Sequence, residues 1–184
     1  TIGHKLAGNW LEKMGESESA TLAEHFERAG DPARAVDWYR KAAQQALEGN
    51  DVEAALVRVN RGIACGATEA NLSALHVLRT EALMWSGAYA ESQRLALEAL
   101  SMLPQGTETW FKAIGLAIWL SRNVNDRQTI VRLAELLRRQ GPSPDAGGAP
   151  AMPWALALWS LIHLRSYDVA AELTMDNAVR FYED

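Results

Sequence analysis

The sequence predicts an all-α fold of about five helical hairpins, and three observations lead to this expectation. Alternating runs rich in Val, Ile and Thr, which are typical of strands, do not occur. Gly, Pro, Asn and Asp recur at short intervals and divide the chain into roughly ten segments of helical length. Two of these segments, residues 29–47 and 86–104, match each other nearly position for position. Together these features favour a repeat of helices.

The composition suits one domain or one repeat array. The chain has 184 residues, of which 48% are hydrophobic, enough for a continuous core. Its formal net charge of -5 argues against phosphate backbones and anionic membrane surfaces as partners, because both attract clustered positive charge. The most apolar segments, residues 110–120 and 152–164, fall short of the roughly 20 residues that span a bilayer. We therefore expect neither a nucleic-acid partner nor a membrane.

The cysteine content and the first residues of the chain indicate the cellular compartment of the protein. Cys65 is the only cysteine, so it can form neither an intrachain disulfide nor a cysteine-based zinc cluster, which fits a reducing cytoplasm. The first residues lack the features of a secretory signal and an initiator methionine. We expect residues 1–184 to form a single repeat domain, cytoplasmic and cut from a larger protein. Residues 141–153 hold four of the six prolines and read as a surface loop within it.

Helix ends are marked by their local chemistry. Gly30 can adopt the left-handed conformation that ends a helix, Asp31 can cap the next helix, and Pro32 suits its first position. Other cap candidates stand at three further breaks: Asp51, Thr107, and Asn125 with Gln128 as a capping box.

Small and aromatic residues follow the helical period in the two matching segments. Ala35, Tyr39 and Ala42 share one face of the first segment, and Ser92 and Ala99 take the equivalent places in the second. This pattern resembles the second helix of the tetratricopeptide repeat, a unit of about 34 residues of helix, turn and helix. The resemblance implies a right-handed superhelix, or solenoid, in which small residues let helices cross closely.

The preceding segment supports the same resemblance. Leu22, Ala23 and Phe26 stand where that family has its large, small and aromatic residues in the first helix. The pairing that uses every helix gives five hairpins, near 3–30, 33–65, 69–103, 107–140 and 150–183. A register that starts at residue 17 is the alternative.

A longer resemblance covers roughly residues 4–120. HKLAGNWLE (4–12), followed by LAEHFERAGDPARAVDWYRKAAQQALEGNDVEAAL (22–56), is similar to the helical arm that follows the ATPase module of large bacterial signalling proteins. Some of these proteins also carry a serine/threonine kinase domain. The resemblance implies a regulatory arm in signal transduction, with kinase or ATPase domains outside this chain.

Sequence patterns of catalysis are missing. We find no phosphate-binding glycine loop, no G-x-S-x-G nucleophile elbow and no H-E-x-x-H zinc helix. The four histidines, His4, His25, His76 and His163, fall on four different predicted helices. We therefore expect no catalytic residues, no cofactor and no metal site, and we do not expect an enzyme.

Seven tryptophans are many for this length. They either line an aromatic groove or fill gaps between hairpins, and we favour the second interpretation for most of them. Trp38 is an exception because it lies next to Tyr39 and off the small-residue stripe, so one of the two aromatics should face away from the main helix contact.

In tetratricopeptide arrays the first helix of each unit lines a concave groove. Aligning this chain with such units places a mostly apolar set on that surface: Tyr39, Val77, Glu81, Met84, Phe111, Ile118, Trp159 and Ile162. With Trp38, these residues form the predicted partner-binding set. Such a groove suits an amphipathic helix, an extended apolar peptide or a neighbouring domain of the parent chain. The alternative is that the phase differs and these residues are core.

The function predicted on this basis is that of a protein-interaction scaffold. A second hypothesis is self-association, in which the apolar hairpin around residues 152–164 covers its counterpart in another copy to form a homodimer. An enzyme ranks third.

Overall fold

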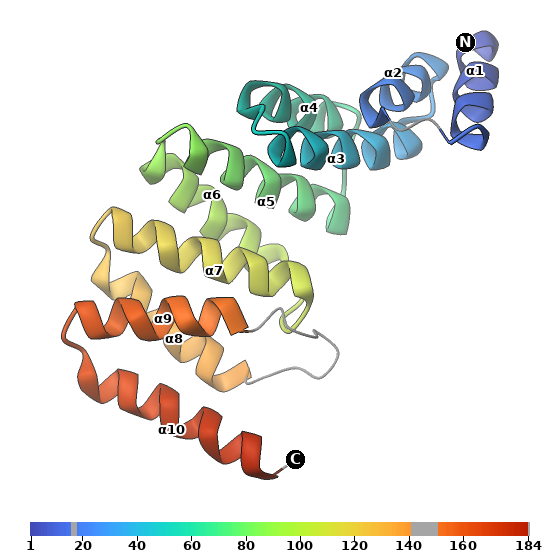
Figure 1. Cartoon of the computed structure of the whole chain (residues 1–184). Coiled ribbons are helices and arrows are strands. Elements are labelled where there is room, and N and C mark those ends of the chain that lie inside the picture. The colour runs from blue at the N-terminus through green and yellow to red at the C-terminus, as the bar shows by residue number, and fades with distance from the viewer. Residues whose placement is uncertain (16–17, 141–150, 184) are drawn as a thin grey trace. The chain divides into compact units, whose positions relative to one another are not determined.

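In a computed structural model of the chain, residues 1–15, 18–140 and 151–183 are described, and they confirm an all-α fold (Figure 1). The helices are α1 (Ile2–Lys13), α2 (Ser19–Ala29), α3 (Pro32–Glu48), α4 (Val52–Ala64), α5 (Glu69–Trp85), α6 (Tyr89–Met102), α7 (Glu108–Asn123), α8 (Arg127–Gln140), α9 (Ala151–His163) and α10 (Tyr167–Glu183). None of these helices is long and apolar enough to cross a bilayer.

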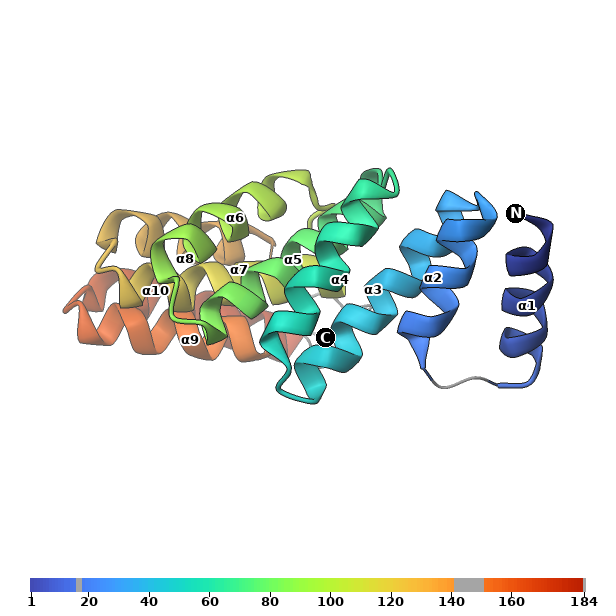
Figure 2. The same ribbon diagram turned by 90° about the horizontal axis from the view of Figure 1, so that it is seen from above.

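The chain divides into two compact units, Thr1–Gly87 with α1 to α5 and Ala88–Asp184 with α6 to α10. In the first unit each helix packs on the next along the chain, and α3 also packs on α5. Figure 2 shows α1 beside α2. In the second unit α7 contacts α6, α8 and α9, while α10 contacts α8 and α9. The register that starts at residue 17 pairs α2 with α3, α4 with α5, α6 with α7 and α8 with α9, and each of these pairs packs together.

Three predicted helix caps are confirmed. Gly30 takes a left-handed conformation with φ 78° and ends α2, while the Asp31 side chain accepts from the Arg34 N–H at 3.4 Å to start α3. Asp51 accepts from the Ala54 N–H at 3.0 Å, and the Thr107 hydroxyl accepts from the Trp110 N–H at 3.2 Å. These side chains satisfy N–H groups that have no partner inside their own helix.

The predicted capping box at Asn125 and Gln128 is wrong by one residue. Asn125 instead takes a left-handed conformation with φ 58°, which asparagine tolerates better than most residues. The cap of α8 is Asp126, whose carboxylate accepts from the Thr129 N–H at 3.1 Å. This carboxylate also accepts from the Gln93 side chain at 2.8 Å and so ties α8 to α6.

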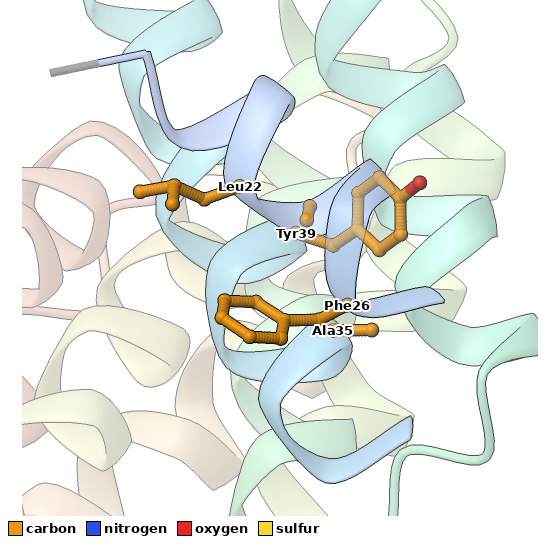
Figure 3. Close-up of a cluster of buried hydrophobic side chains, with 5 residues drawn as sticks. Leu22, Phe26, Ala35 and Tyr39 are labelled. Carbon is orange, nitrogen blue, oxygen red and sulfur yellow. The ribbon is translucent and has the colours of Figure 1, made fainter. Parts of the chain in front are cut away.

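The core of the first unit is built around the α2–α3 contact. Leu22, Ala23, Phe26, Ala35 and Tyr39 form one buried cluster, as the small, large and aromatic pattern predicts (Figure 3). Ala35 is fully buried, and its small side chain lets the backbones of α2 and α3 approach closely.

The core of the second unit is centred on α7. Trp110 and Phe111 are buried and meet edge to face, with ring centroids 5.1 Å apart. Gly115 lies where α9 approaches, because a Cβ at this position would contact Pro153 Cγ at 3.4 Å. The small residues Ser92 and Ala99 of α6 are fully buried, as Ala35 and Ala42 are in α3.

Most of the loop predicted at 141–153 lies outside the described residues. Residues 151–153 belong to the first turn of α9. Pro153 is accommodated there because the first N–H groups of a helix have no intrahelical acceptor to lose.

Candidate functional site

Trp38 and Tyr39, the adjacent aromatics of α3, point in different directions. Tyr39 is 1% exposed and belongs to the core, whereas Trp38 is only partly buried. The Lys41 ammonium lies 3.9 Å from the centroid of the Trp38 ring. Of the two aromatics, Trp38 is therefore the one that reaches the surface.

Tyr39 takes part in a set of hydrogen bonds that connects α2, α3 and α4. Its hydroxyl donates to the Glu27 carboxylate at 2.5 Å, and Arg61 of α4 donates to Glu27 at 2.6 Å and to Glu24 at 2.8 Å. Burial and the hydrogen bond to Glu27 raise the pKa of Tyr39 well above its usual value. The phenol thus stays protonated and acts as a donor that holds three helices together.

The other predicted partner-binding residues are buried in some cases and exposed in others. Val77, Phe111 and Ile118 are buried, which agrees with the alternative that they are core. Glu81 and Met84 are half-buried on α5. Trp159 and Ile162 of α9 are 42% and 45% exposed, so they offer apolar surface to a partner.

The exposed side of α7 is displaced by about one residue from the predicted one. Lys112 is exposed and Trp119 is half-exposed, while Phe111 and Ile118 just before them point into the core. Successive residues of a helix are rotated by about 100° about its axis. An assignment that is wrong by one residue therefore mistakes buried residues for exposed ones.

Arg122 joins the outer sides of α7 and α9, which lie side by side (Figure 1). Its guanidinium carbon lies 3.8 Å from the centroid of the Trp159 ring. A cation over an indole face is attracted by the ring quadrupole, so the pair holds both side chains in place. Trp119 lies one turn before Arg122, and Ile162 lies one turn after Trp159.

These four residues, Trp119, Arg122, Trp159 and Ile162, define what we call the α7–α9 face. Two further aromatic contacts fix its edges. Tyr89 of α6 meets Trp119 edge to face, with centroids 5.6 Å apart. The His163 ring lies 4.7 Å from the Trp159 ring, and its Nδ1 is 2.9 Å from the Trp159 carbonyl oxygen.

Sequence reasoning placed Trp159 and Ile162 in the binding set but missed Trp119 and Arg122. The interpretation of most tryptophans as residues that fill gaps between hairpins places Trp119 in the core. The signal that could have found it is the spacing of Lys112, Trp119 and Asn123, which puts polar residues on the same side of α7 as one aromatic.

The chemistry available at the α7–α9 face is that of recognition. It presents two indole rings, an aliphatic side chain and a guanidinium, which contribute contact area, stacking and charge. Elsewhere the structure pairs His4 with His25, whose Nδ1 atoms are 3.3 Å apart. In the described part of the chain, however, no group of three or more His, Cys, Asp or Glu side chains could hold a metal ion.

Comparison of the chain with known protein families, with curated proteins and with solved structures gave no match.

Proposed function

We propose that this chain is a protein-interaction scaffold, the regulatory arm of a multidomain signalling protein, and that it binds its partner on the α7–α9 face. The observation that carries the proposal is the pair formed by Arg122 and Trp159. An exposed tryptophan held by a cation at 3.8 Å is ordered before the partner arrives. Binding then costs less side-chain entropy than it would with a free ring.

The expected partner is an apolar segment of another protein or of a neighbouring domain of the parent chain. Tryptophan and arginine are the residues that most often dominate the binding energy of interfaces. Ile162 adds an apolar side chain beside them, which suits a helix or extended peptide that carries large apolar residues. The resemblance to signalling ATPase arms supports the regulatory role.

The test compares partners recovered from a native lysate by wild-type protein and by Trp159→Ala, followed by measurement of Kd for each recovered protein. We expect at least one partner whose binding weakens by about 2 kcal/mol in Trp159→Ala, the loss typical of a central interface tryptophan. Arg122→Ala should weaken the same partner, because the indole loses the group that orients it.

Tyr167→Ala is the matched control, since Tyr167 is a 60% exposed aromatic of the same unit that lies outside the face. It should leave binding unchanged. Circular dichroism must show equal helix content for all three variants. Partners that bind Trp159→Ala and wild type equally would contradict the proposal.

Self-association is a second candidate function, and the exposure of α9 favours it. Met152 is 67% exposed and lies on the same helix as Trp159 and Ile162. Sedimentation equilibrium tests the idea. A dimer that dissociates in Met152→Asp would support it, and a monomer at all concentrations would refute it.

A further inference from the structure

A groove follows the outer side of α8. Two depressions form it, one of about 510 Å³ between α6, α7 and α8, and one of about 670 Å³ on α8 itself. Arg132 and Glu135 line both depressions, so the two lie next to each other, and together we call them the α8 groove. None of the four residues of the α7–α9 face lines either one.

Apolar side chains form much of the wall of the depression between α6, α7 and α8. They come from the end of α6, the turn after it, the start of α7 and the middle of α8: Leu97, Leu100, Leu103, Trp110, Leu133 and Leu136. Leu97 and Leu136 are only half-buried, so apolar surface remains open to a ligand.

The charged side chains of the groove are mainly arginines. Arg127 and Arg132 line the depression on α8 itself, and Arg132 and Arg139 line the one between α6, α7 and α8. Glu135 is the acidic residue among the lining residues, and it pairs with Arg138 at 2.7 Å and with Arg139 at 3.0 Å. The chain as a whole has a net charge of -5, so three arginines with one acidic residue in the groove are opposite in sign to that net charge.

Two of these arginines make no ion pair with the described residues. Arg127 donates to the neutral Ser166 hydroxyl at 3.1 Å. Arg132 is exposed and makes no hydrogen bond or ion pair with the described residues, although the Asp126 carboxylate is near enough for its charge to be felt. Asp126 itself is engaged by Thr129 and Gln93.

We propose that the α8 groove binds an acidic amphipathic peptide of a partner protein, with its apolar side chains against the leucines and its carboxylates against the arginines. Arg127 and Arg139 are separated by about 18 Å along the helix axis, at about 1.5 Å per residue. A ligand that meets all three arginines must carry several carboxylates over that length, which a peptide does and a single lipid head group does not.

A nucleic acid fits the groove less well. It would meet the arginines but would leave the leucine wall facing a sugar–phosphate backbone. The negative charge of the rest of the chain would also repel it. The site is independent of the α7–α9 face, so the groove and that face can fail separately.

The experiment uses three matched fluorescent peptides of about 15 residues with one stripe of leucines and with Glu, Gln or Lys at the remaining positions. Fluorescence anisotropy on the whole chain should show the Glu peptide binding about tenfold tighter than the Lys peptide. Arg132→Glu should weaken the Glu peptide by about fivefold to tenfold, because attraction is replaced by repulsion. Higher salt should reduce the preference, as expected for exposed charges.

Arg94→Glu is the matched control, because Arg94 is an exposed arginine of α6 that does not line the groove. It should leave binding unchanged, and so should Trp159→Ala. A fourth variant, Leu97→Gln, should weaken all three peptides by removing apolar wall. No binding by any peptide, equal binding by all three, or indifference to Arg132→Glu would each overturn the proposal. A fluorescent oligonucleotide that binds more tightly than the Glu peptide would do the same.

Discussion

At the scale of single residues, Tyr39 shows how one side chain serves both packing and polar contact. Its ring lies in the cluster with Leu22 and Phe26 (Figure 3). Its hydroxyl donates to the Glu27 carboxylate. The ring contributes buried apolar area, and the hydroxyl gives Glu27 a second donor besides Arg61.

Tyr39→Phe should lower the free energy of unfolding by about 1 to 2 kcal/mol, because it removes a donor to a charged acceptor and leaves the ring in place. Urea denaturation followed by circular dichroism measures the change. Tyr167→Phe, at an exposed tyrosine, is the control and should change nothing. Equal stabilities of Tyr39→Phe and wild type would show that Arg61 alone satisfies Glu27.

Glu135 makes stability depend on pH in the acid range. Hydrogen bonds from Arg138 and Arg139 lower the pKa of this carboxyl from 4.5 to about 2. A carboxyl whose pKa falls on folding stabilises the native state fully above pH 4.5 and loses that contribution as the pH drops towards 2. Glu135→Gln should therefore reduce Tm at pH 7 but have little effect near pH 2.

The measurement is thermal unfolding of both proteins across that pH range, with Glu98→Gln as the control. Glu98 is an exposed carboxylate whose ion pair with Arg94 spans 3.5 Å, so its effect should be small throughout. A constant Tm difference between Glu135→Gln and wild type would contradict the lowered pKa.

At the scale of helices, close approach depends on residues without large side chains. Gly62 of α4 lies where α3 and α5 both come near. A Cβ there would meet Leu75 Cδ1 at 3.0 Å and Tyr39 Cβ at 3.2 Å. The Tyr39 Cβ is held by its own backbone, so it cannot move aside cheaply.

Gly62→Leu should destabilise the protein by about 1 to 3 kcal/mol through overpacking, despite the better helix propensity of leucine. The control is Asn60→Leu on the exposed side of the same helix, where we expect a change within about 0.5 kcal/mol. Chemical denaturation measures the free energy of unfolding of both variants. If Gly62→Leu were as stable as wild type, α4 would have room to move away from α3 and α5.

At the scale of the whole molecule, the first unit has a core of its own. Three clusters of buried residues in α2 to α5 are described: Leu22, Ala23, Phe26, Ala35 and Tyr39 in one, Val36, Ala43, Val59, Leu75 and Leu78 in a second, and Ala46, Ala55 and Ala82 in a third. A unit that buries its apolar residues against one another has what independent folding requires.

A fragment of residues 1–87 should therefore fold to a helical state with a cooperative thermal transition. Circular dichroism checks its helix content, and Tyr39→Phe should destabilise the fragment by the same amount as the whole chain. An unfolded fragment, or a transition without cooperativity, would show that the second unit is needed for folding.

Much of the helical architecture follows from local chemistry and could be predicted. Caps at Asp31, Asp51 and Thr107 depend on a side chain and an N–H group three residues apart, so the sequence shows both partners. Cap prediction was wrong at Asn125, where adjacent Asn and Asp both favour a helix start. Only the backbone conformation separates their roles.

The sequence by itself determined that the chain forms helices, where most of them begin and end, and which small residues pack between them. Tertiary structure alone decided which side of α3 and α7 faces outward, and it brought Arg122 to Trp159 and Arg132 to the leucine wall of the α8 groove. The physical reason is that capping and periodicity act within one helix. Which side of a helix faces solvent, and which side chains meet across two helices, depends on the rotation of each helix about its axis. A rotation by one residue would expose Ile118 in place of Trp119, or Tyr39 in place of Trp38.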